Sequence, residues 1–337
     1  MSNINTKFLS AAEVADYNTS HYWEFPQFQP GILDFINRNV TILPRIKTVA
    51  ATGHPSRYRE QAKLPSNAQF VNVRNGVADG SYGLTSVNAD YGRVEKAAFL
   101  KCLVSRIQYT LFDKEVVQQQ GITEETLTKD FNDMLADFYM VQNDKIWNGK
   151  GTGPDDSSST EYSGILTQVK TKLSIATPYD FTTKQGDMVT DQIRAQIAKM
   201  LAEAKWNVWP TAVYTDPVMV ERITMEERNR EGTVQVVPPT MKLANGWEVP
   251  TINTPVGNLP LIPDAALKST ADAGKQKHTI AVVNENLIER HYLTSSTPRI
   301  FKMSQDEKLM DDYIAILFDT LVVKGAEQAH FIIEESI

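Results

Sequence analysis

The chain has 337 residues, of which 42% are hydrophobic and 22% charged, a balance typical of a folded protein with its own core. The formal net charge of −7 excludes a global positive field that recruits nucleic acid, and the single cysteine, Cys102, excludes an internal disulfide and a cysteine-rich metal site. The sequence has neither a secretion signal nor an apolar run of about 20 residues, so we expect a protein made in the cytosol without a membrane partner.

Residues 1–46 are predicted to form an N-terminal arm rather than a domain. The segment 21–28 gathers four aromatic side chains beside a proline and has no helical or strand period. Exposed aromatic residues of this kind usually need a partner surface. Two alternatives remain open, because either the body of the same chain or a neighbouring subunit can cover them. Trp23 and Phe25 are therefore candidate subunit-interface residues.

Residues 47–99 are predicted to form an extended loop, built as a long two-stranded ribbon. Glycines punctuate the segment, and the alternation in residues 69–74 precedes Asn75-Gly76, a pair that favours a β-hairpin. The segment has too little apolar material for a core, and a two-stranded ribbon alone is marginally stable in water. We therefore expect the ribbon to lie on another surface.

Residues 100–150 are predicted to form a unit around one long helix that runs from residue 122 to residue 148. Apolar side chains recur there at steps of three and four residues, which is the spacing of one buried helical face. Such a helix is roughly 40 Å long. Phe131 and Phe138 lie on the apolar face and are expected in the core.

A glycine-rich exit ends this helix, and Gly164-Ile165-Leu166 returns the chain to the core. Residues 151–292 are predicted to form a second compact unit, and residues 293–337 to contain strands that return to the first unit, together with the C-terminus. Helices are expected at residues 188–204 and after the capping pair Asp216-Pro217. Strands are expected at residues 99–104, 211–215, 234–237, 247–249, 259–262, 279–283, 298–303, 312–323 and 330–334.

The ribbon and the long helix carry opposite charge. Between residues 38 and 63 six basic residues stand against one acidic residue, a balance of +5, and between residues 121 and 144 six acidic residues stand against one basic residue, a balance of −5. One interpretation is that these are two solvated faces of one subunit. The other is that the ribbon and the helix of neighbouring subunits meet. The candidate interface residues are Arg57, Arg59 and Lys63 on the ribbon and Asp130, Asp133 and Asp137 on the helix.

No motif in the sequence predicts a catalytic site, a cofactor site or a metal site. The five histidines are dispersed and lack the spacing of paired metal ligands. Residues 149–153 follow a helix and lack the spacing of a phosphate-binding loop, so they are interpreted as a helix terminus. Asp155 and Asp156 are interpreted as solvated charges rather than cation ligands. A cytosolic α+β enzyme with a site near Asp216 or Glu289 is the rival hypothesis from a different class.

The order of arm, glycine-punctuated ribbon, long acidic helix and glycine-rich exit resembles the major capsid proteins of tailed bacteriophages, which have the Hong Kong 97-type fold. The matching residues at the exit are Gly149, Gly151, Gly153 and Gly164-Ile165-Leu166. Near the carboxyl end, residues 284–293, 319–321 and 329–330 are similar to one subgroup of phage head proteins.

The resemblance implies an α+β fold with an N-terminal arm, an extended β-hairpin loop, a peripheral domain with a long spine helix, and an axial domain. It implies a non-catalytic shell subunit that assembles as pentamers and hexamers into the icosahedral head of a virion, in the host cytoplasm. The head encloses double-stranded DNA without reading its sequence. An encapsulin-like compartment is the alternative function within the same fold.

The resemblance also implies further partners, namely a portal and the scaffolding or decoration proteins of such heads. The arm is too short to contain a scaffolding segment, so a separate scaffolding protein or none is implied. Covalent lysine–asparagine cross-linking, known in part of the family, is not carried over, because Lys63 of the ribbon has no matched partner in this sequence.

Overall fold

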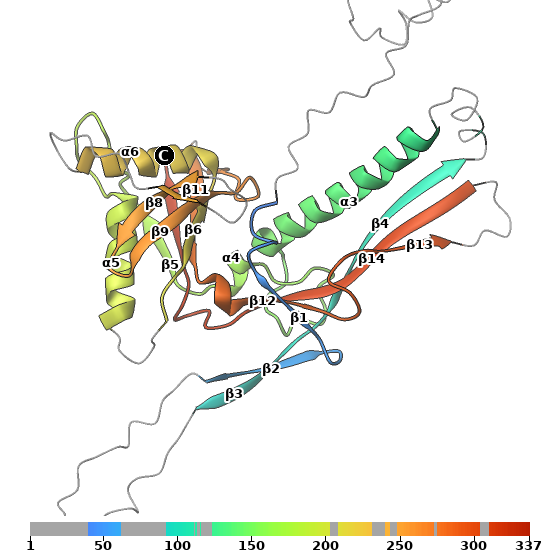
Figure 1. The fold of residues 1–337 in the computed structure, drawn as a ribbon. Helices are drawn as coiled ribbons and strands as arrows, with labels where there is room; N and C mark the ends of the chain where they lie inside the picture. The colour runs from blue at the N-terminus through green and yellow to red at the C-terminus, as the bar shows by residue number, and fades with distance from the viewer. Residues whose placement is uncertain are drawn as a thin grey trace, which may run out of the picture. The chain divides into compact units, whose positions relative to one another are not determined.

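Figure 1 shows the computed structural model of the chain, which combines helices and strands in an α+β arrangement. It describes residues 40–61, 92–110, 112, 115, 123–202, 208–230, 240–242, 248–272, 275–303 and 310–337. The predictions that lie outside the described residues concern the aromatic segment with Trp23 and Phe25, the hairpin at residues 69–76, Lys63, and the strand at residues 234–237.

A five-stranded sheet is organised around its longest strand, β14 (Met310–Val323), which pairs with β4 (Lys101–Thr110) along the whole length of β4. On its other edge β14 pairs with β12 (Ile288–Tyr292) and with β13 (Arg299–Met303). β1 (Lys47–Ala50) extends the sheet by parallel pairing with β12. The strands predicted for the segments of β4, β13 and β14 are confirmed.

An eight-stranded sheet carries the helices α5 (Val189–Ala202) and α6 (Pro217–Arg230). Its strands, in spatial order, are β5 (Lys172–Ile175), β15 (Phe331–Ser336), β11 (Lys275–Val283), β6 (Ala212–Thr215), β9 (Gly257–Pro263), β8 (Glu248–Thr254) and β7 (Thr240–Lys242), with β10 (Thr270–Asp272) paired to β11. Apolar side chains from the sheet and both helices form one core. Both predicted helices are confirmed, as are the strands predicted for the segments of β6, β8, β9, β11 and β15.

Three pairings differ from the predicted division of the chain. β1, expected in the extended loop, belongs to the five-stranded sheet, and so does β12, expected in the second compact unit. β15, expected among the strands that return to the long helix, pairs with β5 and β11 in the eight-stranded sheet. Gly325 turns the chain between β14 and β15, and its φ of +65° suits glycine because a Cβ atom strains that backbone conformation. Periodicity predicts a strand but not its partner, which explains these differences.

The long helix is α3 (Thr123–Asn148), and its predicted end at residue 148 is confirmed. Phe138 is 1% exposed and lies in one apolar cluster with Leu317 of β14, so its predicted core position is confirmed. Phe131 is only partly buried and packs at the margin of this cluster, edge-on against the ring of Tyr313 with 5.0 Å between the ring centroids. Its predicted core position is therefore confirmed only in part, because helical spacing identifies the inward face but not how far the sheet covers it.

The exit of α3 and the return at Gly164 touch backbone to backbone. The Gly164 amide donates to the Gly149 carbonyl at 3.0 Å. A Cβ atom at Gly149 would overlap the carbonyl oxygen of Tyr162, and one at Gly164 would overlap the carbonyl oxygen of Trp147. Glycine is therefore required at both positions, since any side chain pushes the two segments apart.

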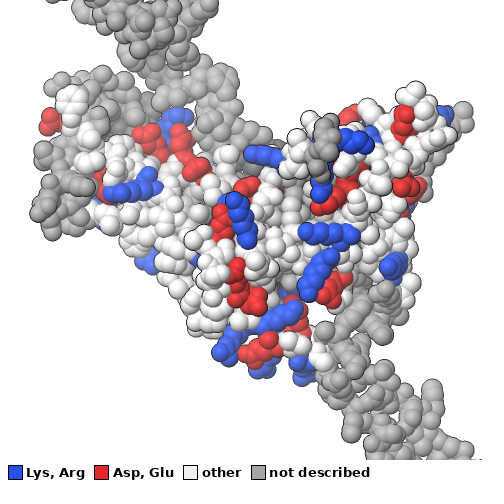
Figure 2. All heavy atoms as spheres, turned by 180° about the vertical axis from the view of Figure 1, so that it is seen from behind, with Lys and Arg blue, Asp and Glu red and all other residues white. Residues whose placement is uncertain are grey.

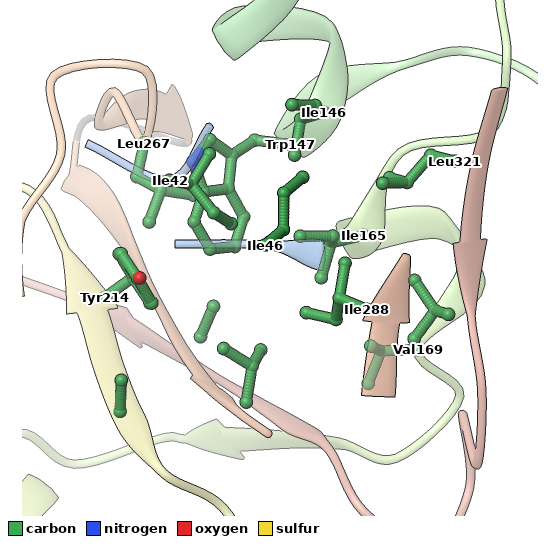
Figure 3. Close-up of a cluster of buried hydrophobic side chains, with 14 of the residues drawn as sticks. Ile42, Ile46, Ile146, Trp147, Ile165, Val169, Tyr214, Leu267, Ile288 and Leu321 are labelled. Atoms are coloured by element: carbon green, nitrogen blue, oxygen red, sulfur yellow. The ribbon is translucent and has the colours of Figure 1, made fainter. Parts of the chain in front are cut away.

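Figure 3 shows the core where both sheets meet the end of α3. Trp147 is fully buried there, and its ring centroid lies 5.1 Å from that of Tyr214 in β6. The indole Nε1 of Trp147 donates to Asp264 Oδ2 at 2.9 Å. Asp264 also accepts hydrogen bonds from the Asn143 side chain at 3.1 Å and from the Thr41 hydroxyl. One buried carboxylate thus joins α3, the segment before β1 and the end of β9.

We expect Phe138→Ala to lower the free energy of unfolding by about 3–5 kcal/mol, because it leaves a cavity at a fully buried position. Phe131→Ala should lower it by only about 1–2 kcal/mol, because that ring is already partly in water. Denaturant unfolding of the full-length protein measures both values. Met140→Ala on the exposed face is the control and should change little. Equal losses at Phe131 and Phe138 would contradict the buried face assigned to α3.

Gly164→Ala should lower the free energy of unfolding by at least about 3 kcal/mol, because its methyl group must displace backbone atoms that cannot rotate away. Gly53→Ala is the matched control, since no atom lies within 4 Å of the Cβ position there. Thermal unfolding compares the two variants. If both unfold at the same temperature, the backbone contact yields at little cost and glycine is not required.

Candidate subunit interface

The predicted ribbon is confirmed over its described part. β2 (Ser56–Gln61) and β3 (Arg93–Ala98) pair antiparallel, with Ser56 opposite Ala98 and Gln61 opposite Arg93. The buried side chains of this ribbon are Ser56, Tyr58 and Ala98, all at the end nearest the five-stranded sheet. The other end is exposed, as expected for a ribbon without a core of its own.

The root of the ribbon is fixed to the five-stranded sheet by apolar and polar contacts. Tyr58 and Ala98 form a buried cluster with Val322 of β14. The Ser56 hydroxyl lies 2.8 Å from Nδ1 of His291 in β12. Burial is the main cause that raises the pKa of the Tyr58 phenol, so this group stays neutral and acts as an apolar anchor.

The arginines of the ribbon are exposed and lie beside one carboxylate of the same chain. The side chains of Arg57 and Arg59 are 72% and 80% exposed. Their guanidinium nitrogens lie 3.3 Å and 3.6 Å from the two carboxylate oxygens of Glu95 on β3. Exposed pairs of this kind contribute about 0–1 kcal/mol each. Both arginines therefore remain available to a second partner.

The three predicted aspartates of α3 lie together beside β4. Asp130, Asp133 and Asp137 line a surface depression of about 310 Å³ together with side chains of β4. The Tyr109 hydroxyl of β4 donates to Asp130 at 3.0 Å. The depression is an acidic groove along the edge of the five-stranded sheet, in which the α3 aspartates predicted to contact a basic segment are grouped. Figure 2 shows that acidic and basic side chains are otherwise interspersed on the face it displays.

The face of the five-stranded sheet turned away from α3 leaves apolar side chains exposed, which sequence reasoning missed. Val104 of β4 is 51% exposed and Phe318 of β14 is 42% exposed. Phe301 and Met303 of β13 and Cys102 of β4 lie on the same side, as the strand register requires. We call these five residues the open sheet face. The alternation of side chains along β4 is a sequence signal for this exposed face. The sequence alone does not determine which of the two apolar faces α3 covers.

Asp216 and Glu289, the residues named for an enzyme site, make structural contacts instead. Asp216 caps α6, accepting from the amides of Val218 and Met219 at 2.9 Å and 3.0 Å. Glu289 lies 2.6 Å from Lys324 Nζ and 3.1 Å from His291 Nε2. Burial raises the pKa of Glu289, but the hydrogen bonds from Lys324 and His291 outweigh burial and lower it. Glu289 is therefore a paired carboxylate rather than a general acid.

A chain of hydrogen-bonded Ser, His and Glu side chains links the root of the ribbon to β12. These residue types also occur together in nucleophilic catalysis. Ser56 contacts one ring nitrogen of His291, and Glu289 contacts the other. All three residues are buried, with exposed fractions of 4%, 4% and 7% for Ser56, His291 and Glu289. A nucleophile must reach its substrate, so the arrangement serves as a buried polar link.

The described ranges of the chain contain neither a metal-binding cluster nor a membrane-spanning helix. No group of three or more His, Cys, Asp or Glu side chains there has a metal-binding arrangement. Asp156 instead accepts hydrogen bonds from Thr152, Ser158 and Ser159 of its own loop, which lower its pKa. None of the described helices is long and apolar enough to cross a membrane.

Solved structures share this arrangement over nearly the whole chain, although no protein-family model and no curated protein matches the sequence. The capsid of Myoviridae phage XM1 matches with a TM-score of 0.61 and 11% identity, over 98% of this chain and 100% of that chain. A chain of Gordonia phage Cozz matches with a TM-score of 0.60 and 12% identity, over 100% and 99% of the two chains.

A chain of an encapsulin complex matches as well. The holo-SrpI encapsulin complex from Synechococcus elongatus gives a TM-score of 0.56 and 14% identity, over 97% of this chain and 96% of that chain. Likenesses at such low identity show a common fold. The predicted α+β fold of capsid subunits is thereby confirmed.

Proposed function

We propose that this chain, which has the Hong Kong 97-type fold, is a major capsid protein that self-assembles into the icosahedral head of a tailed double-stranded DNA phage. The observation that carries the proposal is the match to phage capsid chains over 98–100% of this chain. A fold can host several functions, so features of this chain's own surface must support the assignment.

Three features support a subunit that needs neighbours. The open sheet face exposes large apolar side chains, and such patches mark interaction surfaces. Arg57 and Arg59 of the ribbon share the single carboxylate of Glu95, so one of their two positive charges is not neutralised by it. The acidic groove on α3 has the opposite sign.

The domain division belongs to the same proposal. Residues 1–46 form the arm and residues 47–99 the extended loop, apart from β1. The peripheral domain contains α3 with the five-stranded sheet, and the axial domain contains the eight-stranded sheet with α5 and α6. The arm aromatics Trp23 and Phe25 and the ribbon lysine Lys63 contact neighbouring subunits in the shell.

The rival functions fit the molecule less well. An encapsulin-like compartment has the same fold, as the holo-SrpI complex illustrates, and it encloses cargo protein instead of DNA. A cytosolic enzyme needs an accessible site, whereas Asp216 and Glu289 are buried and already paired. Non-catalytic assembly is therefore the proposed role, with a portal and scaffolding or decoration proteins as partners, in a virion assembled in the host cytoplasm.

Negative-stain microscopy of the purified full-length protein tests the shell assignment. We expect closed shells, because neighbouring subunits would cover the open sheet face and bring the ribbon arginines to acidic side chains. The matched variant replaces residues 62–92 with Asn-Gly, a two-residue turn that suits the cross-strand pair Gln61 and Arg93. It should keep the folded body, seen by circular dichroism, and form no shells.

The outcomes separate the competing functions. Small oligomers of the unmodified chain would contradict any shell function. Normal shells of the shortened variant would contradict an intersubunit role for the ribbon. Particles from the producing cells should contain nuclease-protected double-stranded DNA. A packaged protein without DNA would favour the encapsulin alternative.

The charged surfaces define a second test. We propose that Arg57 and Arg59 contact acidic residues of a neighbouring subunit, with Asp130, Asp133 and Asp137 as candidates, rather than DNA. The double variant Arg57→Glu, Arg59→Glu should impair assembly of DNA-free shells. The defect should be more severe at low ionic strength, where screening is weak. Light scattering during assembly measures both effects.

The control adds Glu95→Arg to the double variant, because reversal alone places three carboxylates together on the ribbon. This triple variant restores pairing within the chain but keeps the reversed sign at Arg57 and Arg59. It should remain assembly-defective. Recovery of assembly would show that these arginines act within their own subunit. Normal empty shells with defective packaging would assign them to DNA.

A further inference from the structure

Two buried carboxylates lie near one guanidinium, that of Arg222, between α6 and the eight-stranded sheet, and only one of them is hydrogen-bonded to it. Glu226 of α6 and Glu335 of β15 are both 0% exposed. Arg222, one helical turn before Glu226, donates to Glu335 Oε1 at 3.0 Å and to the Tyr179 carbonyl at 2.8 Å. The Thr190 amide of α5 donates to Glu226 Oε2 at 3.2 Å. The cluster therefore joins α5, α6 and β15.

The hydrogen bonds of this cluster do not satisfy two ionised carboxylates. Glu226 Oε1 and Glu335 Oε2 are buried and have no hydrogen-bond partner within the described part of the chain. The same holds there for Thr190 Oγ1 and Arg222 Nε. An ionised carboxylate removed from water is costly unless donors or a cation compensate it. A proton on one of the two carboxylates removes this cost.

The balance of charge in this cluster also favours a proton on one of the carboxylates. His278 of β11 stands opposite Glu335 in the strand register, and its Nδ1 lies 2.6 Å from Asp216. The cluster thus contains the carboxylates of Glu226, Glu335 and Asp216, the permanent cation of Arg222 and the imidazole of His278. Even when His278 is protonated, the carboxylates exceed the cations by one. Arg194 of α5 does not correct the balance, because it pairs with Glu227 at 2.9 Å.

We propose that Glu226 and Glu335 form a buried proton-binding site, in which Glu226 holds the proton and its release at rising pH loosens α6 from α5 and β15. The site lies within one subunit, so the proposal does not depend on the proposed shell function. Its ligand is the proton itself. The site makes the seating of α6 on the sheet dependent on pH.

The expected pH range follows from the environment of Glu226. Burial raises its pKa to about 7, with a further contribution from the charge of Glu335, while the Thr190 amide and Arg222 act in the opposite direction. Burial also raises the pKa of Glu335, against Arg222 and His278. Since the pKa of Glu226 in the folded protein lies above its ordinary value of 4.5, the folded state keeps a proton that the unfolded state loses. Stability therefore falls as pH rises from about 4.5 to about 7.

Infrared difference spectroscopy of the full-length protein detects the proton directly. Titration between about pH 5 and pH 9 should show a protonated carboxyl C=O band that disappears near neutrality. Glu226→Gln should remove the part of this band that titrates near pH 7 and leave any contribution of the buried Asp319, whose pKa burial raises to about 6. Between about pH 5 and pH 8 the unfolding equilibrium constant of the unmodified protein should rise about 50–100-fold more than that of Glu226→Gln. Hydrogen exchange in α6 should show the corresponding loss of protection.

Glu227→Gln is the matched control, because it removes the neighbouring carboxylate from a pair that faces Arg194 instead of the cluster. It should retain the band and the pH profile of the unmodified protein. If Glu226→Gln does not fold, Glu335→Gln serves instead, and removal of its charge should shift the titration of the band to lower pH. Absence of a protonated carboxyl at about pH 6 in the unmodified protein, or equal pH profiles with and without Glu226, overturns the proposal.

Discussion

The backbone contact at the end of α3 is the constraint on which the rest of the fold depends. Gly164 packs against the carbonyl of Trp147, so the last turn of α3 has one possible position relative to the returning chain. That position seats the Trp147 ring in the core shared by both sheets and brings its indole to Asp264. The segment before β1 is held at the same place, because the Arg45 guanidinium forms two hydrogen bonds with Glu285. The end of α3, the segment before β1 and both sheets therefore meet at one fixed junction.

A rigid junction combined with an incomplete surface is the physical basis of the proposed function. The body of the chain is well packed, yet the open sheet face is exposed, Arg57 and Arg59 share one carboxylate, and three aspartates line the acidic groove. Individual exposed ion pairs are weak. Repetition over many symmetry-related contacts turns weak pairs into a stable closed assembly, while each single contact can still break and reform during growth.

Sequence patterns predicted the structural features that depend on residues close together in the chain. The apolar stripe predicted α3, and the glycine-rich exit that begins at Gly149 predicted the end of the helix, because a helix face and a helix end each need particular residue types at particular steps. The close backbone approach of Gly164 was found only in the structure. The placement of β1, β12 and β15 was not predictable, since their partners lie 150 residues or more away in some cases and strand pairing leaves no periodic trace. The charge count predicted Asp130, Asp133 and Asp137 as interface candidates, but not that they lie together beside β4. The proton-binding pair was not, because Glu226 and Glu335 read as ordinary surface charges.

The pairing of β1 with β12 has a consequence for synthesis of the chain. Lys47 lies opposite Glu289. β5 pairs with β15, which begins only at Phe331. Contacts this distant in sequence close large loops and fold slowly. Until residues 331–336 have been made, the eight-stranded sheet lacks β15. For the shell function that we propose, this order means that a growing chain is not a finished subunit until its last strand has been made.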